Sequence, residues 1–362
     1  MRAKEISLEL LEQPEAQFSE IISMALPRRV TYSKNVFIPL TNACRNRCSY
    51  CGFRSDKPMI MSRRQVKDVL TSGRKEGCKE ALFTFGEKPE SVKEIKTKLK
   101  SWGYSSAIEY LYDLCEDALA LGLLPHSNPG VMNYGEMKAL KEVNASLGLM
   151  LENSSARLCQ EGMPHEFSPG KRPEVRIKVL EDAGKLRIPF TTGLLIGIGE
   201  TDSEIADSLS TLSNLQEKHG HTQEVIIQNF RPHRGTPMQD KQGPSLLRML
   251  KVVAAARAVL PDIGLQVPPN LNRMWQVFLL FGANDLGGVS PVTKDYINPE
   301  YDWPKIEAVK AVAAEMGVSL KERLPIYPKY IRQGWYATRL GELIERYADE
   351  EGLVHEVSEG LS

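Results

Sequence analysis

Short apolar runs alternate with longer amphipathic stretches along most of the chain from residue 36 onward. The runs are rich in β-branched and aromatic residues, which predicts strands, whereas the stretches repeat apolar residues every three or four positions, which predicts helices. Strands are expected at 36–40, 81–85, 123–127, 146–151, 190–196, 225–230, 264–267 and, as a short run, 284–286. Helices are expected at 62–76, 105–121, 134–143, 173–186, 203–218, 245–259 and 270–281.

This alternation is typical of repeated βα units that build a parallel sheet. Up to eight strands joined by right-handed crossovers predict an α/β fold, namely a (β/α) barrel that is complete or nearly complete at eight strands. We expect residues 35–302 to form the barrel core, with an N-terminal helical extension at 1–34 and a C-terminal helical extension at 303–362 packed on the barrel.

The charge balance and hydropathy exclude two classes of partner. Lysine plus arginine and aspartate plus glutamate are equal at 46 each, so no net field favours nucleic acid or an anionic membrane. No apolar run approaches the ~18–20 residues that cross a bilayer, and the N-terminal segment lacks the apolar core of a signal peptide. We therefore expect a cytoplasmic protein that binds neither nucleic acid nor membrane.

Three cysteines, Cys44, Cys48 and Cys51, lie within eight residues as Cys-x3-Cys-x2-Cys, directly after the first predicted strand. Three thiolates can hold three corners of an iron–sulfur cube and leave the fourth iron without a protein ligand. An open metal position is where a substrate or cofactor can bind, as in catalytic zinc sites. The spacing favours an open iron–sulfur cluster.

Other interpretations of these thiols fit less well. Ordinary buried cysteines seldom fall at such spacing in a chain with six cysteines, and disulfide scaffolds are short and Cys-dense. A zinc site needs a second pair of ligands. The only candidate pair, His219 and His221, lies in a polar stretch that is typical of a helix end and loop.

Polar residues follow the predicted strands at their carboxyl ends, where barrel enzymes build their active sites. They could simply cap the following helices. Their recurrence after several strands favours a polar ligand pocket. The residues concerned include Asn42, Gly86, Glu87, His126, Asn128, Glu152, Asn153, Gln228, Asn229 and Asn270.

The three-cysteine motif resembles that of the radical S-adenosylmethionine (SAM) superfamily, whose fold is a TIM-like (β/α) barrel. The resemblance implies that Cys44, Cys48 and Cys51 bind a 4Fe–4S cluster, whose open iron binds the amino and carboxylate groups of SAM. Reductive cleavage of SAM then yields methionine and a 5′-deoxyadenosyl radical. Tyr50, just before the third cysteine, would pack near the adenine, although plain packing against the barrel is the alternative.

Further segments match the same superfamily and imply SAM contacts. Gly86 and Glu87 fall where relatives carry a Gly-Gly-Glu-type turn that meets the SAM ammonium group, although Phe85 replaces the first glycine. The segment from Gly193 through Gly197 to Glu200 resembles the glycine-rich fifth strand. These residues would form part of the cofactor site.

Two charged residues complete the SAM contacts that the resemblance implies. Glu152 and Arg176 fall where relatives contact the ribose and the carboxylate of SAM, and a guanidinium can bind a carboxylate with two hydrogen bonds. Because Arg176 lies on a charge-rich helix, a solvated helix face is its alternative role.

A closer resemblance covers nearly the whole chain and concerns the small subunit of deazaflavin-forming radical SAM synthases. It is carried by strings such as TNACRNRCSYCGFR, SPGKRPEVRIKVLEDAG, IPFTTGLLIGIGET, QNFRPHRGTPM and GANDLGGVSPVTKDYINPEYDWP. The resemblance implies a carbon–nitrogen lyase that cyclises 5-amino-5-(4-hydroxybenzyl)-6-(D-ribitylimino)-5,6-dihydrouracil and releases ammonia. It also implies a reduced ferredoxin- or flavodoxin-type electron donor, and a transient complex with the partner radical SAM subunit.

Two other functions stay open at this stage. The chain could be the partner enzyme that joins tyrosine to ribityl-diaminouracil, or a non-catalytic iron–sulfur electron carrier. The substrate needs many neutral hydrogen-bonding groups, which the strand ends supply. No residue is assigned as general acid or base.

Overall fold

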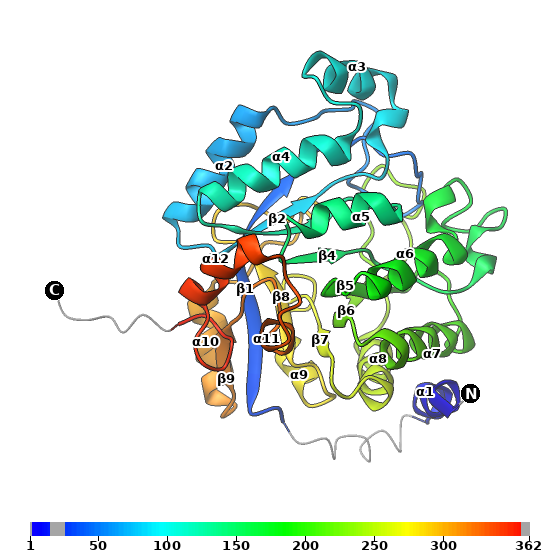
Figure 1. The fold of residues 1–362 in the computed structure, drawn as a ribbon. Helices are drawn as coiled ribbons and strands as arrows, with labels where there is room; N and C mark the ends of the chain where they lie inside the picture. The colour runs from blue at the N-terminus through cyan, green and yellow to red at the C-terminus, as the bar shows by residue number, and fades with distance from the viewer. Residues whose placement is uncertain (1, 15–25, 356–362) are drawn as a thin grey trace.

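The computed structural model describes residues 2–14 and 26–355, and a closed barrel of eight parallel strands lies at its centre (Figure 1). Each strand pairs with its neighbour in sequence, and β1 pairs with both β8 and β2, which closes the barrel. The predicted eight-stranded barrel is therefore confirmed. The strands are β1 Arg29–Pro39, β2 Glu80–Thr84, β3 Leu124–Asn128, β4 Ser146–Gly148, β5 Phe190–Ile196, β6 Thr222–Asn229, β7 Gly264–Gln266 and β8 Asp285–Val289.

Helices cover the outside of the barrel because the outward residues of the strands are apolar. Val36 and Ile38 of β1 belong to the main hydrophobic cluster, and a side chain at Gly73 would lie 2.5 Å from the Val36 Cβ, so the covering helix packs closely. The helices are α2 Arg63–Lys75, α3 Lys93–Ser101, α4 Ala107–Ala120, α5 Tyr134–Lys141, α6 Pro173–Lys185, α7 Asp202–His219, α8 Leu246–Val259 and α9 Trp275–Leu279, with short 3-10 turns at Pro89–Ser91, Ala156–Cys159 and Pro169–Lys171.

Several boundaries differ from the sequence prediction. Strand β1 begins at Arg29 rather than near residue 36, because its polar first half pairs with Ser319–Glu322, a strand that the sequence did not indicate, and with β8. Helix α3 was not predicted, since only Ile95 and Leu99 of its residues are buried. Helix α9 is much shorter than the predicted 270–281, and β4 ends at Gly148.

The C-terminal segment adds a ninth strand as well as helices. Strand β9, Ser319–Glu322, runs parallel to β1 and pairs with residues 29–32 of that strand. The segment also holds α10 Ile306–Glu315, α11 Pro328–Arg332, a 3-10 turn at Thr338–Leu340 and α12 Gly341–Tyr347. The expected extension is thus not purely helical.

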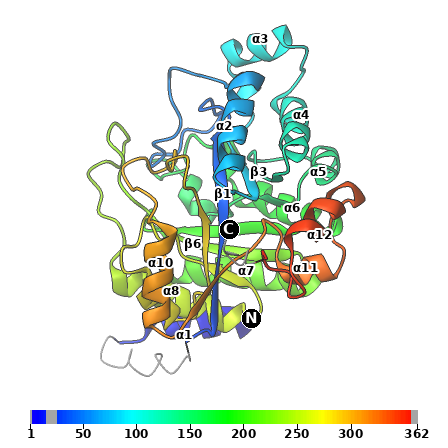
Figure 2. The same ribbon diagram turned by 90° about the vertical axis from the view of Figure 1, so that its left-hand side faces the viewer.

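This C-terminal segment covers the floor of the barrel, where the strands begin. Leu324, Ile326 and Tyr330 pack with Leu124 and Ala145, which lie at or just before the starts of β3 and β4. Figure 2 shows α11 and α12 on one side of the barrel and the loops that follow β6 and β8 on the other. The cavity described below therefore has a closed floor and a mouth formed by loops.

Helix α1, Arg2–Glu12, packs against α7 and α8. Its last turn is capped by the Lys251 ammonium, which donates to the carbonyls of Leu11 and Gln13. Part of the predicted N-terminal extension, residues 15–25, lies outside the described residues.

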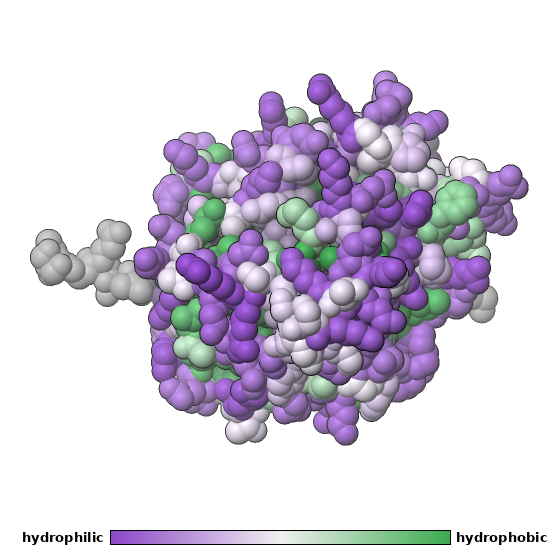
Figure 3. Space-filling model, turned by 90° about the horizontal axis from the view of Figure 1, so that it is seen from above, coloured by the Kyte–Doolittle hydropathy of each residue, from purple (hydrophilic) through white to green (hydrophobic). Residues whose placement is uncertain are grey.

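The surface seen in Figure 3 is mostly hydrophilic, with small and separate apolar areas. Across residues 2–14 and 26–355, none of the helices has both the length and the apolar character needed to span a bilayer.

Candidate active site

A cavity of about 360 Å³ runs through the inside of the barrel, from the three cysteines at the mouth to the C-terminal segment at the floor. This volume falls within the range of small-molecule sites. Cys44, Cys48 and Cys51 all line the cavity, so the structure brings together the three thiols that the sequence singled out.

All three sulfurs accept hydrogen bonds, that of Cys51 from the backbone of Phe53 and Arg54. The backbone N–H groups of Glu87 and Asn46 donate to the Cys44 Sγ at 3.2 and 3.4 Å, and the Ser168 hydroxyl donates to the Cys48 Sγ at 3.2 Å. Donors aimed at sulfur suit thiolates that carry negative charge, and such bonds tune the potential of iron–sulfur clusters.

The thiols suit a cluster better than a single ion. Within the described residues, no three His, Cys, Asp or Glu side chains converge closely enough to hold one metal ion, whereas the corners of a cube each need only one thiolate. Burial raises the pKa of Cys44 and of Cys51, and a bound cation reverses such an effect by binding the thiolate. The three residues therefore fit a 4Fe–4S cluster.

Gly86 supports the cysteine loop from the end of β2. A Cβ at this position would lie 2.0 Å from the carbonyl oxygen of Ala43 and 2.7 Å from the Cβ of Cys44. No side chain fits there, so glycine is required by the approach of the loop. Gly86 also lines the cavity, as expected for a cofactor contact.

Glu87 links the cysteine loop to the opposite wall of the cavity. Its carboxylate accepts from the Arg45 Nε at 2.6 Å and from the Val131 N–H at 3.2 Å, and it lies 3.8 Å from the Arg176 guanidinium. Burial raises the pKa of Glu87, but Arg176 and Arg45 outweigh burial, so the net pKa lies below its usual range. Glu87 is therefore an anion inside the site.

Arg176 faces the barrel rather than solvent, which excludes the solvated helix face. Its side chain is buried, and its Nε donates to the Gly170 carbonyl at 2.8 Å while Nη1 donates to the carbonyl of Met150. The guanidinium is thus held rigidly at the cavity wall.

Glu152 lines the same wall in a strained backbone conformation. Its φ of 65° lies in the left-handed region, which is uncommon for a residue with a side chain and often marks functional sites. Its N–H donates to the Gly193 carbonyl at 3.0 Å, and its carboxylate accepts from the Lys171 ammonium. Lys171 also lines the cavity and was not singled out from the sequence.

The two glycines of the β5 segment lie behind the cavity wall. A Cβ at Gly193 would lie 2.8 Å from the Met150 thioether, so this glycine lets Met150 lie across β5. Gly197 has a φ of 98°, and a Cβ there would lie 2.6 Å from Pro244. Glycine at position 197 therefore permits the turn that follows β5 and its packing against Pro244.

Tyr50 lies on the far side of the cysteine loop. Its hydroxyl is 2.9 Å from the His165 Nε2, and its ring packs against a small apolar cluster that includes Leu195 and Phe230. Burial, together with Lys171, lowers the pKa of His165 to about 2, so the imidazole is neutral. Burial likewise raises the pKa of Tyr50, which stays a phenol.

The polar residues at the strand ends divide into two groups. His126, Asn128, Gln228 and Asn270 line the cavity. Asn153 and Asn229 instead bond to neighbouring backbone and side chains, as in the capping and structural alternative.

Charged residues that the sequence did not single out line the floor of the cavity. They are Glu80, Glu224 and Arg323. Glu80 and Glu224 lie near the starts of their strands, and Arg323 follows β9, so no local pattern distinguishes them from surface charges.

Comparison with known proteins places this barrel in a class. The sequence profile of the Radical SAM superfamily matches residues 38–212, which span the thiol loop and β1 to β5. Among solved structures, the FeFe-hydrogenase maturase HydG from Carboxydothermus hydrogenoformans covers 95% of this chain and 85% of its own, with a TM-score of 0.71 at 17% identity. Methylornithine synthase (PylB) covers 88% and 89%, with a TM-score of 0.64 at 19% identity. The structural likenesses show the fold, and the profile match identifies a radical SAM domain over residues 38–212.

Sequence relatives narrow the class to one family. The 7,8-didemethyl-8-hydroxy-5-deazariboflavin synthase of Methanopyrus kandleri is 54% identical over 89% of this chain and 99% of its own length. The proteins of that name from Methanocaldococcus jannaschii and Archaeoglobus fulgidus are 56% and 51% identical, over 86% and 89% of this chain and 87% and 98% of their own lengths. The chain belongs to the 7,8-didemethyl-8-hydroxy-5-deazariboflavin synthase family.

Proposed function

We propose that the chain converts 5-amino-5-(4-hydroxybenzyl)-6-(D-ribitylimino)-5,6-dihydrouracil to 7,8-didemethyl-8-hydroxy-5-deazariboflavin (FO), with release of ammonia, methionine and 5′-deoxyadenosine. The observation that carries this proposal is the identity of more than half of the residues to synthases of that name over almost their full length. A single cavity that joins the three thiols to a polar floor supports it, because the radical source and the substrate must share one enclosed space.

Cys44, Cys48 and Cys51 would hold the 4Fe–4S cluster. When bound and reduced, the cluster supplies the electron that cleaves SAM and so generates the 5′-deoxyadenosyl radical. The hydrogen bonds from Glu87, Asn46 and Ser168 to the sulfurs stabilise the thiolate form.

The SAM contacts would come from the upper cavity wall. Gly86, Glu87, Glu152 and Arg176 line it. The backbone of the turn at Gly86 and Glu87 would meet the ammonium group, while Glu152 and Arg176 would contact the ribose and the carboxylate. Gly193, Gly197 and Tyr50 lie behind this wall and would shape the adenine region through backbone approach and packing.

The proposal includes partners and a location. A reduced ferredoxin- or flavodoxin-type protein would deliver the electron, and the partner radical SAM subunit would supply the adduct in a transient complex. Both steps would take place in the cytoplasm, where thiols stay reduced.

Anaerobic reconstitution with iron and sulfide, followed by turnover, tests the function. With SAM, a reductant and the preformed adduct, we expect FO, identified by its mass and fluorescence. With tyrosine and ribityl-diaminouracil instead, we expect no adduct. Adduct formation would identify the partner enzyme, and cluster binding without SAM cleavage would identify an electron carrier.

A further inference from the structure

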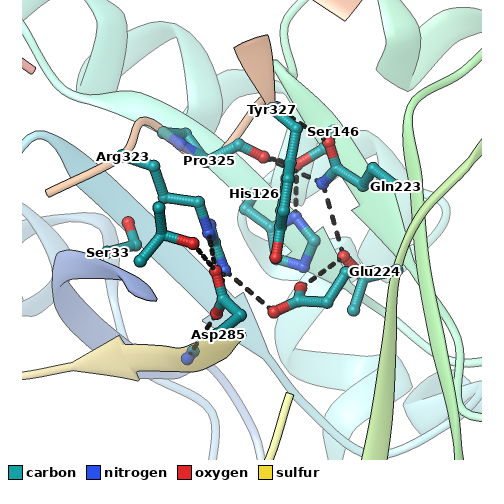
Figure 4. Close-up of polar contacts among 12 residues, drawn as sticks. Ser33, His126, Ser146, Gln223, Glu224, Asp285, Arg323, Pro325 and Tyr327 are labelled. Atoms are coloured by element: carbon teal, nitrogen blue, oxygen red, sulfur yellow. Dashed lines mark hydrogen bonds and ion pairs between the residues drawn. The ribbon is translucent and has the colours of Figure 1, made fainter. Parts of the chain in front are cut away.

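The floor of the cavity holds a buried network of charges that no SAM contact requires (Figure 4). The Arg323 Nη2 donates to Glu224 at 2.8 Å, and its Nε and Nη2 donate to the two oxygens of Asp285 at 2.7 and 3.0 Å. The guanidinium also lies 4.3 Å from the centre of the Tyr327 ring. All of these groups lie at the end of the barrel opposite the cysteines.

Asp285 and Glu224 both accept hydrogen bonds from Arg323, but they differ in how many of their acceptor sites the protein fills. Asp285 also accepts from the Gly287 N–H and from the Thr31 hydroxyl, so its oxygens are filled by protein donors. Within the described part of the chain, the Glu224 carboxyl accepts from Arg323 and from the Thr191 hydroxyl, the latter at 2.9 Å. Glu224 also lines the cavity, whereas Asp285 does not. A carboxylate has about four acceptor sites, so Glu224 can take further hydrogen bonds from a ligand.

His126 presents a second acceptor at the same depth. The Ser146 hydroxyl donates to the Pro325 carbonyl at 2.5 Å, so the His126 Nδ1 must donate to that hydroxyl, also at 2.5 Å. Burial, with Arg323 nearby, lowers the pKa of His126 to about 3, which keeps the ring neutral. Its Nε2 is therefore unprotonated, and the Asn128 side chain, which also lines the cavity, hydrogen-bonds to the same residue.

Apolar and polar side chains alternate around the cavity between this floor and the cysteines. Leu149, Met150, Leu195 and Ile226 line this level. Gln228 and Gln266 line it too, because they pair with Leu195 and Ile226 on the neighbouring strands. The cavity thus has a thiol end, a mixed middle zone that suits a flat ring with polar edges, and an acceptor-rich floor.

We propose that the floor formed by Glu224, His126 and Arg323 is the subsite for a polyhydroxyl chain, the ribityl group of the substrate, which enters the barrel first. The inference rests on the proposed function and adds the direction of binding. The uracil ring then lies in the mixed middle zone, where its polar edges can meet Gln228 and Gln266, and the benzyl carbon faces the cysteine end. A phenol brings one hydroxyl, whereas the ribityl chain brings several that can both donate to Glu224 and His126 and accept from Arg323.

The C-terminal segment is part of this subsite, because Arg323 and the Pro325 carbonyl come from it. Their hydrogen-bond partners come from β4, β6 and β8. The segment that closes the barrel floor therefore also sets the substrate specificity of the cavity.

The test compares three substrates with wild type and Glu224→Gln. The substrates are the natural adduct, an analogue in which methyl replaces ribityl, and an analogue made from phenylalanine that lacks the phenol hydroxyl. Because a buried donor or acceptor that loses its partner is costly, we expect E224Q to lower kcat/KM for the natural adduct about 10- to 100-fold. We expect the same loss with the phenylalanine analogue and less than about 3-fold change with the methyl analogue.

Matched variants separate this role from a structural one. Glu322 is also a largely buried carboxylate near the floor but does not line the cavity, so Glu322→Gln should stay within about 3-fold of wild type on all substrates. If E224Q fails to fold, His126→Phe is compared with wild type on the same three substrates. This substitution removes the Nε2 acceptor. SAM affinity and iron content, measured for each variant, show whether the cysteine end of the cavity is intact.

The outcomes are distinct. An equal loss on the natural and methyl substrates, or a loss confined to substrates with the phenol hydroxyl, would overturn the subsite. An E322Q variant that behaves like E224Q would do so as well. If wild type forms no FO from the adduct, the proposed function itself fails.

Discussion

The backbone N–H of Glu87 donates a hydrogen bond to the sulfur of Cys44 at 3.2 Å, while the Glu87 carboxylate holds Arg45 of the same loop. One residue just after β2 therefore fixes both the orientation of the Cys44 thiol and the charge beside it. The conformation of the cysteine loop therefore depends on contacts with the end of β2 as well as on its own sequence.

Replacement of Cys48 by Ala should remove one corner of the cluster. We expect bound iron to fall from about four atoms per chain to background, and 5′-deoxyadenosine formation to be lost. Iron analysis and product quantification after anaerobic reconstitution measure this. Cys159→Ala is the control, because Cys159 does not line the cavity, and it should keep both properties. SAM cleavage retained in C48A would contradict the cluster assignment.

Gly86→Ala should displace the cysteine loop without touching a thiol. The new Cβ would overlap the Ala43 carbonyl at 2.0 Å, so the loop or the strand end must move. We expect cluster content and activity to fall at least about 10-fold, since misplacement by an ångström can cost 10²-fold in rate. Gly341→Ala is the control, because its nearest neighbour would lie at 3.7 Å and its φ is helical. Equal activity of the two variants would contradict the packing argument.

Arg323→Gln should destabilise the fold strongly. It leaves Asp285 and Glu224 buried without their counter-charge, which costs about 3–5 kcal/mol for comparable buried pairs. Urea unfolding measures the change. Arg339→Gln removes an exposed pair with Glu116 and should cost less than about 1 kcal/mol. A loss in R323Q as small as in R339Q would show that the floor network contributes little to stability.

Glu204 should make stability depend on pH in the acid range. The hydrogen bond from Arg157 is the main cause that lowers the pKa of Glu204 from 4.5 to about 2. Because the folded pKa is the lower one, the stabilisation is present above pH 4.5 and is lost as the pH falls toward 2. Unfolding free energies measured on descending pH should therefore fall more steeply for wild type than for Glu204→Gln. The exposed substitution Glu345→Gln serves as control, and parallel curves for wild type and E204Q would contradict the assignment.

The barrel and the thiol loop could be predicted because both depend on local pattern. Strands such as β5 and helices such as α7 show their periodicity within a single window, and three thiols in eight residues need no tertiary information. By contrast, β9 was missed because Ser319–Glu322 carries only one buried residue. Its pairing with β1 joins segments almost 300 positions apart, which no window of sequence contains.

Among the site residues, the sequence found those with a motif and missed those defined by burial. It singled out Cys44, Cys48, Cys51 and Glu87, which the structure brings to one cavity. It left Arg176 between two roles, and burial of the side chain excludes the solvated helix face. Lys171 and Glu224 were missed because the sequence alone does not show whether a charged side chain faces the interior or the solvent.

The sequence by itself determined the strand–helix alternation, the three-thiol motif and the family, since these are properties of order along the chain. The tertiary structure decided that a side chain at position 86 would clash with the cysteine loop. It also decided that Arg323 would form an ion pair with Glu224, 99 positions earlier in the chain. Both follow from how the barrel closes, because closure brings strand starts and the C-terminal segment to one floor and excludes water from the charges that meet there.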